Sequence, residues 1–151
     1  VSKATLYLRW QDKASLLIDS LHFAYPPWTF DPGSTADEKL IALVEVMIRE
    51  FTNETGWAVH RALRDPDLPP ALRDCCRTIV HNRLAAIDRL VEDARDQLPG
   101  GSCAGPPLIR QLLVGAAMGE AGDILLTARQ CDPDAIGNLA EAAVGLILCR
   151  R

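Results

Sequence analysis

The chain has 151 residues and a formal net charge of −4, which allows one sizeable hydrophobic core and excludes a generally basic, polyanion-binding protein. Aromatic residues make up 5% of the chain, and no alternating apolar pattern is bounded by Asn-Gly or Asp-Gly turns. These features exclude a mainly β fold and predict an all-α protein. The apolar stretches 106–128 and 139–149 are interrupted by charges or too short to span a bilayer, so we expect a soluble protein.

The first seventeen residues carry the most specific motif of the chain, Val-Ser-x-x-Thr-Leu-Tyr-x-x-Trp-x-x-Lys-x-x-Leu. Ser2 can cap a short helix that ends near Arg9, and Asp12 can cap a second helix that ends where Tyr25 meets Pro26. The motif therefore predicts a helix, a tight turn and a second helix. A net charge of +2 over the first 13 residues makes this the part of the chain that favours a polyanion.

This motif resembles the recognition helix and the following helix of TetR-family transcriptional repressors. In that family two further helices precede the motif, so we expect an amphipathic helix and a second helix ending in Ala-Gly before Val1. The resemblance implies that the residues at the family's DNA-contacting positions bind DNA here. They are Ser2, Lys3 and Ala4, which begin the helix that enters the major groove, and Thr5, Tyr7 and Lys13, which hold phosphates. Leu8 departs from the usual polar residue, which leaves the operator sequence open.

The segment after the second helix contains three prolines and a glycine, which exclude a helix there. We therefore divide the chain into a partial helix-turn-helix head (residues 1–25), a connecting loop (26–34) and a helical regulatory and dimerisation domain (35–151). This division describes an all-α protein in which the remnant of a DNA-binding head is followed by a ligand-binding and dimerisation body.

The body opens with two predicted helices. Thr35 and Glu38 have the spacing of a capping box and begin a helix that should end near Asn53. Gly56 is expected to interrupt the chain, and a short helix is predicted over residues 57–64.

A long helix of roughly 45 Å is predicted from Pro69 to about Leu98, because apolar residues recur there with a period of 3.6. We expect Arg83 to lie outside its apolar face, with the other charged residues. Two more helices follow over 107–129 and 135–149, and the last is apolar nearly all round.

The last two helices predict a homodimer. A helix that is apolar on several sides must be covered on several sides, and three glycines on the preceding helix allow another helix to approach closely. Pairing both helices with their copies in a second chain satisfies both conditions, and the family resemblance implies the same four-helix interface. The predicted interface residues are Leu112, Gly115, Gly119, Gly122, Leu139, Ala143, Leu146 and Ile147. The alternative is a fully buried helix within a monomer.

Two acidic residues, Glu120 and Asp123, project onto a partly apolar sector of the helix over 107–129. They reach solvent at the edge of the interface, or they face an internal cavity. In a cavity they would suit a ligand that carries positive charge or hydrogen-bond donors. The candidate apolar walls of such a cavity are Met47, Phe51, Trp57 and Met118, for each of which core packing is the alternative.

Metal binding and catalysis are not expected. His22, His60 and His81 are isolated on different predicted helices, with no Glu or Cys at metal-ligand spacing, so we expect no metal or other cofactor. No catalytic motif occurs, and we do not expect an enzyme. The five cysteines form no CxxC pair and nothing at the N-terminus resembles a signal peptide, which predicts reduced thiols in the cytoplasm.

The function expected from these features is a ligand-responsive transcriptional repressor. It would bind a near-palindromic operator as a homodimer and be released by a small-molecule effector. The alternative is a helical dimerisation or small-molecule-binding module without a DNA function.

Overall fold

The computed structural model describes residues 8–96, 105–127 and 132–148. These residues form six helices and no strand, so the all-α prediction is confirmed for the described part of the chain. The helices are α2 (Lys13–Ala24), α3 (Ala36–Phe51), α4 (Glu54–Ala62), α5 (Pro70–Asp96), α6 (Pro106–Thr127) and α7 (Pro133–Ile147). None of the described helices has the length and apolar character needed to cross a membrane.

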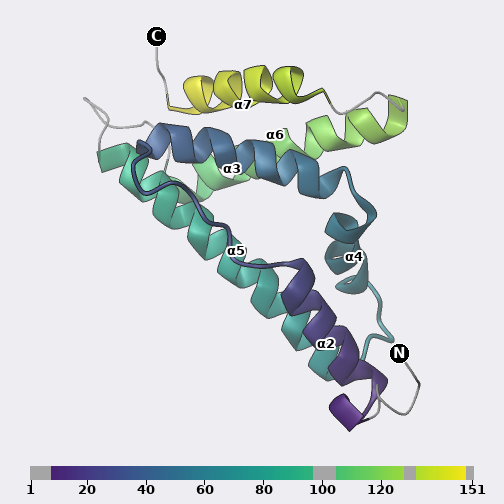
Figure 1. Cartoon of the computed structure of the whole chain (residues 1–151). Coiled ribbons are helices and arrows are strands. Elements are labelled where there is room, and N and C mark those ends of the chain that lie inside the picture. Colours follow the sequence, from purple (N-terminus) through teal and green to yellow (C-terminus); the bar gives the residue numbers. More distant parts are fainter. Residues whose placement is uncertain (1–7, 97–104, 128–131, 149–151) are drawn as a thin grey trace.

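Helix α3 is the central helix of the body and packs against α4, α5, α6 and α7. In Figure 1, α3 crosses the upper part of the molecule, α5 runs diagonally beneath it, and α4 lies between the far ends of these two helices. Helix α2 lies along α5, and the connection that follows α2 runs back along α5 to the start of α3. The predicted head helix is therefore attached to the same helix that forms one side of the body.

Local capping chemistry determines where three of the helices begin. The Asp12 carboxylate accepts a hydrogen bond of 2.7 Å from the Ser15 amide at the start of α2. Thr35 and Glu38 form the predicted capping box, with Glu38 accepting from the Thr35 amide at 2.7 Å. Asp132 caps α7, which has proline in its first turn. These predicted helix starts are confirmed.

The start of α4 differs from the prediction. The helix begins at Glu54 and is capped by Asn53, whose side chain accepts a hydrogen bond of 2.7 Å from the Gly56 amide. A Cβ atom at Gly56 would lie 1.7 Å from the backbone oxygen of Glu50. Gly56 therefore does not interrupt the helix, as its helix-breaking tendency suggested, but allows the first turn of α4 to lie directly against the end of α3.

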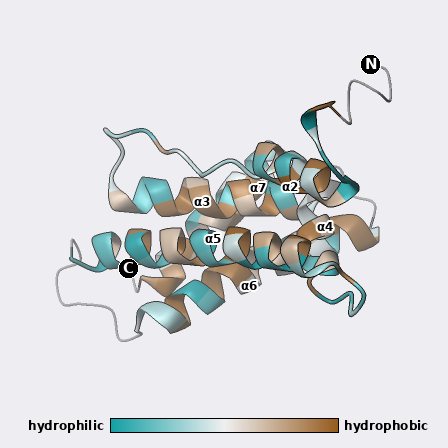
Figure 2. Cartoon of the chain, turned by 90° about the horizontal axis from the view of Figure 1, so that it is seen from below, coloured by the Kyte–Doolittle hydropathy of each residue, from teal (hydrophilic) through white to brown (hydrophobic). Residues whose placement is uncertain are grey.

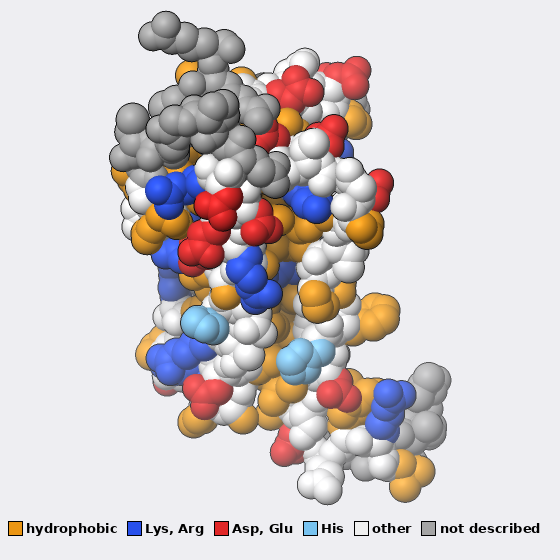
Figure 3. Space-filling model, turned by 90° about the vertical axis from the view of Figure 1, so that its left-hand side faces the viewer, with side chains coloured by type: hydrophobic (Ala, Val, Ile, Leu, Met, Phe, Trp, Pro, Cys, Tyr) orange, Lys and Arg blue, Asp and Glu red, His pale blue; other side chains and the backbone are white. Residues whose placement is uncertain are grey.

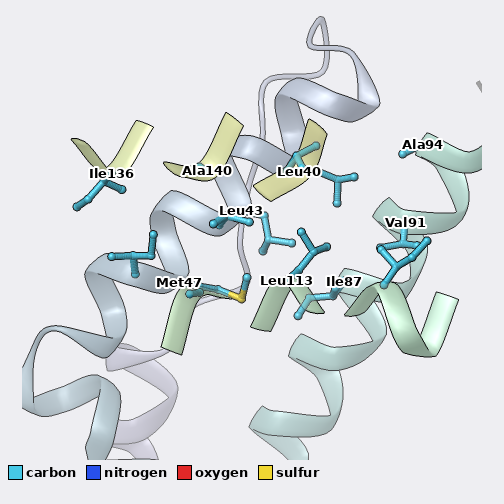
Figure 4. Close-up of a cluster of buried hydrophobic side chains, with 14 of the residues drawn as sticks. Leu40, Leu43, Met47, Ile87, Val91, Ala94, Leu113, Ile136 and Ala140 are labelled. Atoms are coloured by element: carbon cyan, nitrogen blue, oxygen red, sulfur yellow. The ribbon is translucent and has the colours of Figure 1, made fainter. Parts of the chain in front are cut away.

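The hydrophobic core lies between α3, the C-terminal half of α5, and the inner faces of α6 and α7. Figure 4 shows the side chains of α3 interleaved with those of the three neighbouring helices. The labelled core residues are Leu40, Leu43, Met47, Ile87, Val91, Ala94, Leu113, Ile136 and Ala140, all of which are buried. The C-terminal end of α3 and the N-terminal half of α5 diverge on the side of α4, and a cavity lies between them.

Candidate ligand cavity and dimer surface

A cavity of about 70 Å³ lies where α3, α4 and α5 diverge, and the connection after α2 closes its outer side. Its apolar walls include Met47 and Phe51 from α3, Val59 from α4 and Ile87 from α5. One residue of α6, Val114, also reaches it. An apolar enclosure with a few polar side chains is the usual form of a small-molecule site.

The polar part of the cavity is built around Arg83. Its guanidinium group pairs with the Glu50 carboxylate, joining α5 to α3. The Trp28 indole donates a hydrogen bond of 3.2 Å to the other oxygen of Glu50. The guanidinium carbon lies 4.2 Å from a Trp28 ring centroid and 5.2 Å from that of Tyr25. Arg83 is therefore held on two aromatic side chains of the segment that joins α2 to the body.

The second terminal nitrogen of Arg83 is buried and has no hydrogen-bond partner within the described part of the chain. A buried donor without a partner costs about 1–3 kcal/mol. The Arg83 side chain thus keeps hydrogen-bonding capacity after its pairing with Glu50. A molecule that reached this nitrogen with an acceptor would remove the cost.

Burial sets the charge of the other titratable groups in the cavity. It lowers the pKa of His60, and the nearby Arg64 and Arg83 lower this pKa further, so that the imidazole is neutral at pH 7. Burial also raises the pKa of Tyr25, which keeps its phenol protonated. The other acidic and basic side chains of the cavity lining are Glu50 and Arg83, which form an ion pair.

A larger groove of about 550 Å³ lies outside the cavity, between α5 and the segment after α2. Tyr25, Trp28, Ile79 and Arg83 line both spaces, so they form a shared wall. The groove also includes Arg89, and its described lining contains no acidic residue. Figure 3 shows the side of the molecule along which α5 runs, where basic, acidic and histidine side chains are interspersed with exposed hydrophobic ones.

The predicted ligand-binding residues divide into two groups. Met47 and Phe51 line the cavity, while Trp57 packs against Phe51 with a ring-centroid distance of 5.7 Å and lies outside the lining. The structure does not place Met118, Glu120 or Asp123 in this lining either.

Glu120 and Asp123 therefore do not line this cavity, and a role for them in ligand binding stays a prediction. Asp123 is exposed and Glu120 is half-buried, beyond the part of α6 that reaches the cavity through Val114. A helical projection gives the sector on which a side chain lies, but it does not show which neighbouring helix faces that sector. The acid of this cavity is Glu50.

Arg83 was expected outside the apolar face of α5, and this expectation was wrong. It lies four residues after Ile79 and four before Ile87, so all three share one face of the helix. This spacing is a sequence signal that identifies Arg83 as a side chain directed toward the interior. Nothing comparable in the sequence connects Arg83 with Glu50 or Trp28.

The outer face of α6 carries the predicted dimer residues. A Cβ atom at Gly115, Gly119 or Gly122 would meet no atom within 4 Å, so no helix of the described chain packs against these glycines. Leu112 on the same face is exposed, as is Leu146 on α7. In Figure 2 the ribbon of α6 carries both hydrophobic and hydrophilic positions along its length.

The remaining predicted interface residues, Leu139, Ala143 and Ile147, are half-buried within their own chain. Leu139 and Ile147 pack against the hydrophobic core. Helix α7 is therefore covered on one side by its own chain, through buried residues such as Ile136 and Val144, and is open along the side that carries Leu146.

Of the predicted DNA-binding residues, Lys13 lies at the start of α2 and is exposed. Ser2, Lys3, Ala4, Thr5 and Tyr7 lie outside the described residues. Trp10, which precedes α2, donates a hydrogen bond of 2.8 Å from its indole nitrogen to Asp19 and so fastens the turn to the helix. Helix α2 itself buries no side chain, and its Phe23 is exposed.

Comparisons of the chain with protein-family models, with curated proteins and with solved structures gave no match.

Proposed function

We propose that this chain belongs to a ligand-responsive transcriptional repressor, similar to the TetR family, that binds DNA as a homodimer. One observation carries the proposal: the segment that follows α2 forms a wall of the cavity through Tyr25 and Trp28. A ligand in the cavity presses on the connection to the helix that carries Lys13. Ligand binding in the body is thereby coupled to the position of the DNA-binding head.

The dimer is supported by the outer face of α6. Apolar side chains and open glycines lie together on that face, where they are in contact with water in a single chain. A second copy that packs the same faces against each other buries the leucines and brings helix backbones close at the glycines. Two chains then present two heads to one duplex.

The DNA function is supported by the motif of residues 1–17 and by the position of α2. A helix with no buried side chain and an exposed phenylalanine, Phe23, is suited to packing against further helices of a head. Two such heads related by a two-fold axis read two inverted half-sites. Lys13, exposed at the start of α2, is placed to contact a phosphate.

The ligand acts through differential affinity. We expect the ligand to bind more tightly to the conformation that does not bind DNA. The ligand then weakens DNA binding, and DNA weakens ligand binding by the same factor, typically about 5- to 150-fold. We expect the contacts of Arg83 with Trp28 and Glu50 to differ between the two conformations.

The test compares the full-length gene product with its Lys13→Ala variant on duplex DNA at several salt concentrations. Loss of one phosphate contact lowers affinity on all sequences and flattens the logarithmic salt slope by about one. Lys39→Ala, on α3, is the matched control and leaves the slope unchanged. An unchanged slope for Lys13→Ala refutes the assignment of that contact. If the protein forms a dimer that binds ligand but not DNA, the alternative function, a ligand-binding module without a DNA function, is correct.

A further inference from the structure

We propose that the ligand is an amphipathic anion whose apolar part fills the inner cavity and whose anionic group lies in the outer groove beside Arg83 and Arg89. Trp28 is the movable partition between the two spaces. This inference rests on the proposed function in treating the cavity as the effector site. It adds the chemical class of the effector and the side chain that admits it.

The inner cavity is too small for such a ligand unless Trp28 moves. An apolar cavity of about 150 Å³ accommodates benzene, so a space of about 70 Å³ is too small for an effector with a hydrophobic body. The groove outside measures about 550 Å³. A ligand gains the necessary room when the wall shared by the two spaces opens.

That shared wall is the one best able to move. On the inner side, Met47 and Ile87 belong to the hydrophobic core and cannot shift without disturbing it. Trp28 lies in a segment without helical structure and is only half-buried. It packs against the edge of the core and is held there by the indole hydrogen bond to Glu50 and by its stacking on Arg83. An apolar group that enters the cavity can take over the stacking position on Arg83.

The charges fix the orientation of the ligand. Glu50 occupies the inner side of Arg83, so an anionic group is repelled from the cavity itself. The groove contains Arg83 and Arg89 and no acidic residue among its described lining. Arg83 has a buried terminal nitrogen without a partner, which a carboxylate at the wall would satisfy while the other nitrogen keeps Glu50. A cation in the groove would meet two like charges instead.

The test uses three compounds with the same phenylpropyl group: 4-phenylbutyrate, 4-phenylbutyramide and 3-phenylpropylammonium. The protein carries Trp10→Phe and Trp57→Phe, so that Trp28 is its single tryptophan. We expect the carboxylate to bind at least about tenfold more tightly than the ammonium compound. Saturation should shift the Trp28 emission to longer wavelength as the indole leaves Arg83 and enters water.

Substitutions in the groove separate charge recognition from apolar contact. Arg89→Gln should lower the affinity for 4-phenylbutyrate about tenfold and leave that for the amide within about twofold. Arg77→Gln is the matched control, because Arg77 is exposed on α5 but lies outside the groove lining. Thermal melts monitored by circular dichroism confirm that each variant folds.

Four results overturn the inference: the ammonium compound binds as tightly as the carboxylate, Arg89→Gln weakens all three compounds equally, calorimetric saturation leaves Trp28 emission unchanged, or none of the compounds binds at millimolar concentration. The proposed function is decided separately by DNA binding of the full-length protein. The two failures are therefore distinguishable.

Discussion

Leu112→Ala tests the dimer surface at a single side chain. Leu112 is 47% exposed in one chain, so about half of it remains to be buried by a partner. Complete burial of a leucine side chain contributes about 1.5–3 kcal/mol, and half of that is about 1 kcal/mol per copy. A two-fold interface contains the residue twice, which gives about 2 kcal/mol and an increase of about 30-fold in the dimer Kd.

Leu125→Ala is the matched control, because Leu125 is 50% exposed on the same helix but lies beside Thr52, Trp57 and Arg61 at the junction of α3 and α4. Sedimentation velocity over a concentration series measures both dissociation constants. We expect Leu125→Ala to change the dimer Kd by less than about threefold. Gly119→Leu should weaken the dimer more than Leu112→Ala, because it inserts a side chain at a close helix contact. An equal effect of both leucine substitutions, or a monomer in the unsubstituted chain, refutes this use of the α6 face.

Two further predictions concern stability. Gly56→Ala brings a Cβ atom against the backbone oxygen of Glu50 and should lower the free energy of unfolding by about 1–3 kcal/mol in urea titrations, whereas Gly137→Ala, where the nearest atom lies at an ordinary 3.5 Å, should lower it by no measurable amount. Equal effects would contradict the close approach of α4 to α3. His60 has a pKa below its usual 6.5 in the folded chain, so the unfolded chain takes up the proton first and stability falls as the pH drops below about 6.5. Above that pH both states are neutral and His60 contributes no pH dependence. His60→Gln should remove this part of the acid sensitivity, and identical pH profiles for the two proteins would show that burial of His60 does not act in this way.

The features that sequence reasoning identified depend on neighbours in the chain. Thr35 and Glu38, three positions apart, form a capping box. The long run of apolar residues with a period of 3.6 is sufficient to predict α5. Such patterns predict helices and their starting points without knowledge of the fold. The turn before α2, with Asp12 as its cap, belongs to the same class.

The features that it missed depend on contacts between distant segments. Gly56 was interpreted as a helix breaker. Its role is to let α4 approach the Glu50 backbone closely, and this contact exists only in the folded chain, where α4 lies against α3. The pairing of Arg83 with Glu50 joins residues 33 positions apart, and no local pattern connects them. Glu120 was chosen from the projection of one helix, which cannot show that the cavity opens elsewhere. Arg83 lies four residues from the apolar residue Ile79. A search of the sequence for charged residues at this spacing from apolar positions would have identified Arg83, but not its partner Glu50.

The most direct test of the central claim is selection of duplexes from a randomised library by the full-length gene product, followed by measurement of the stoichiometry of the complex. We expect enrichment of sequences with two inverted half-sites and one chain bound at each half-site. Binding of one chain at a single site, or enrichment of no common sequence, would contradict it.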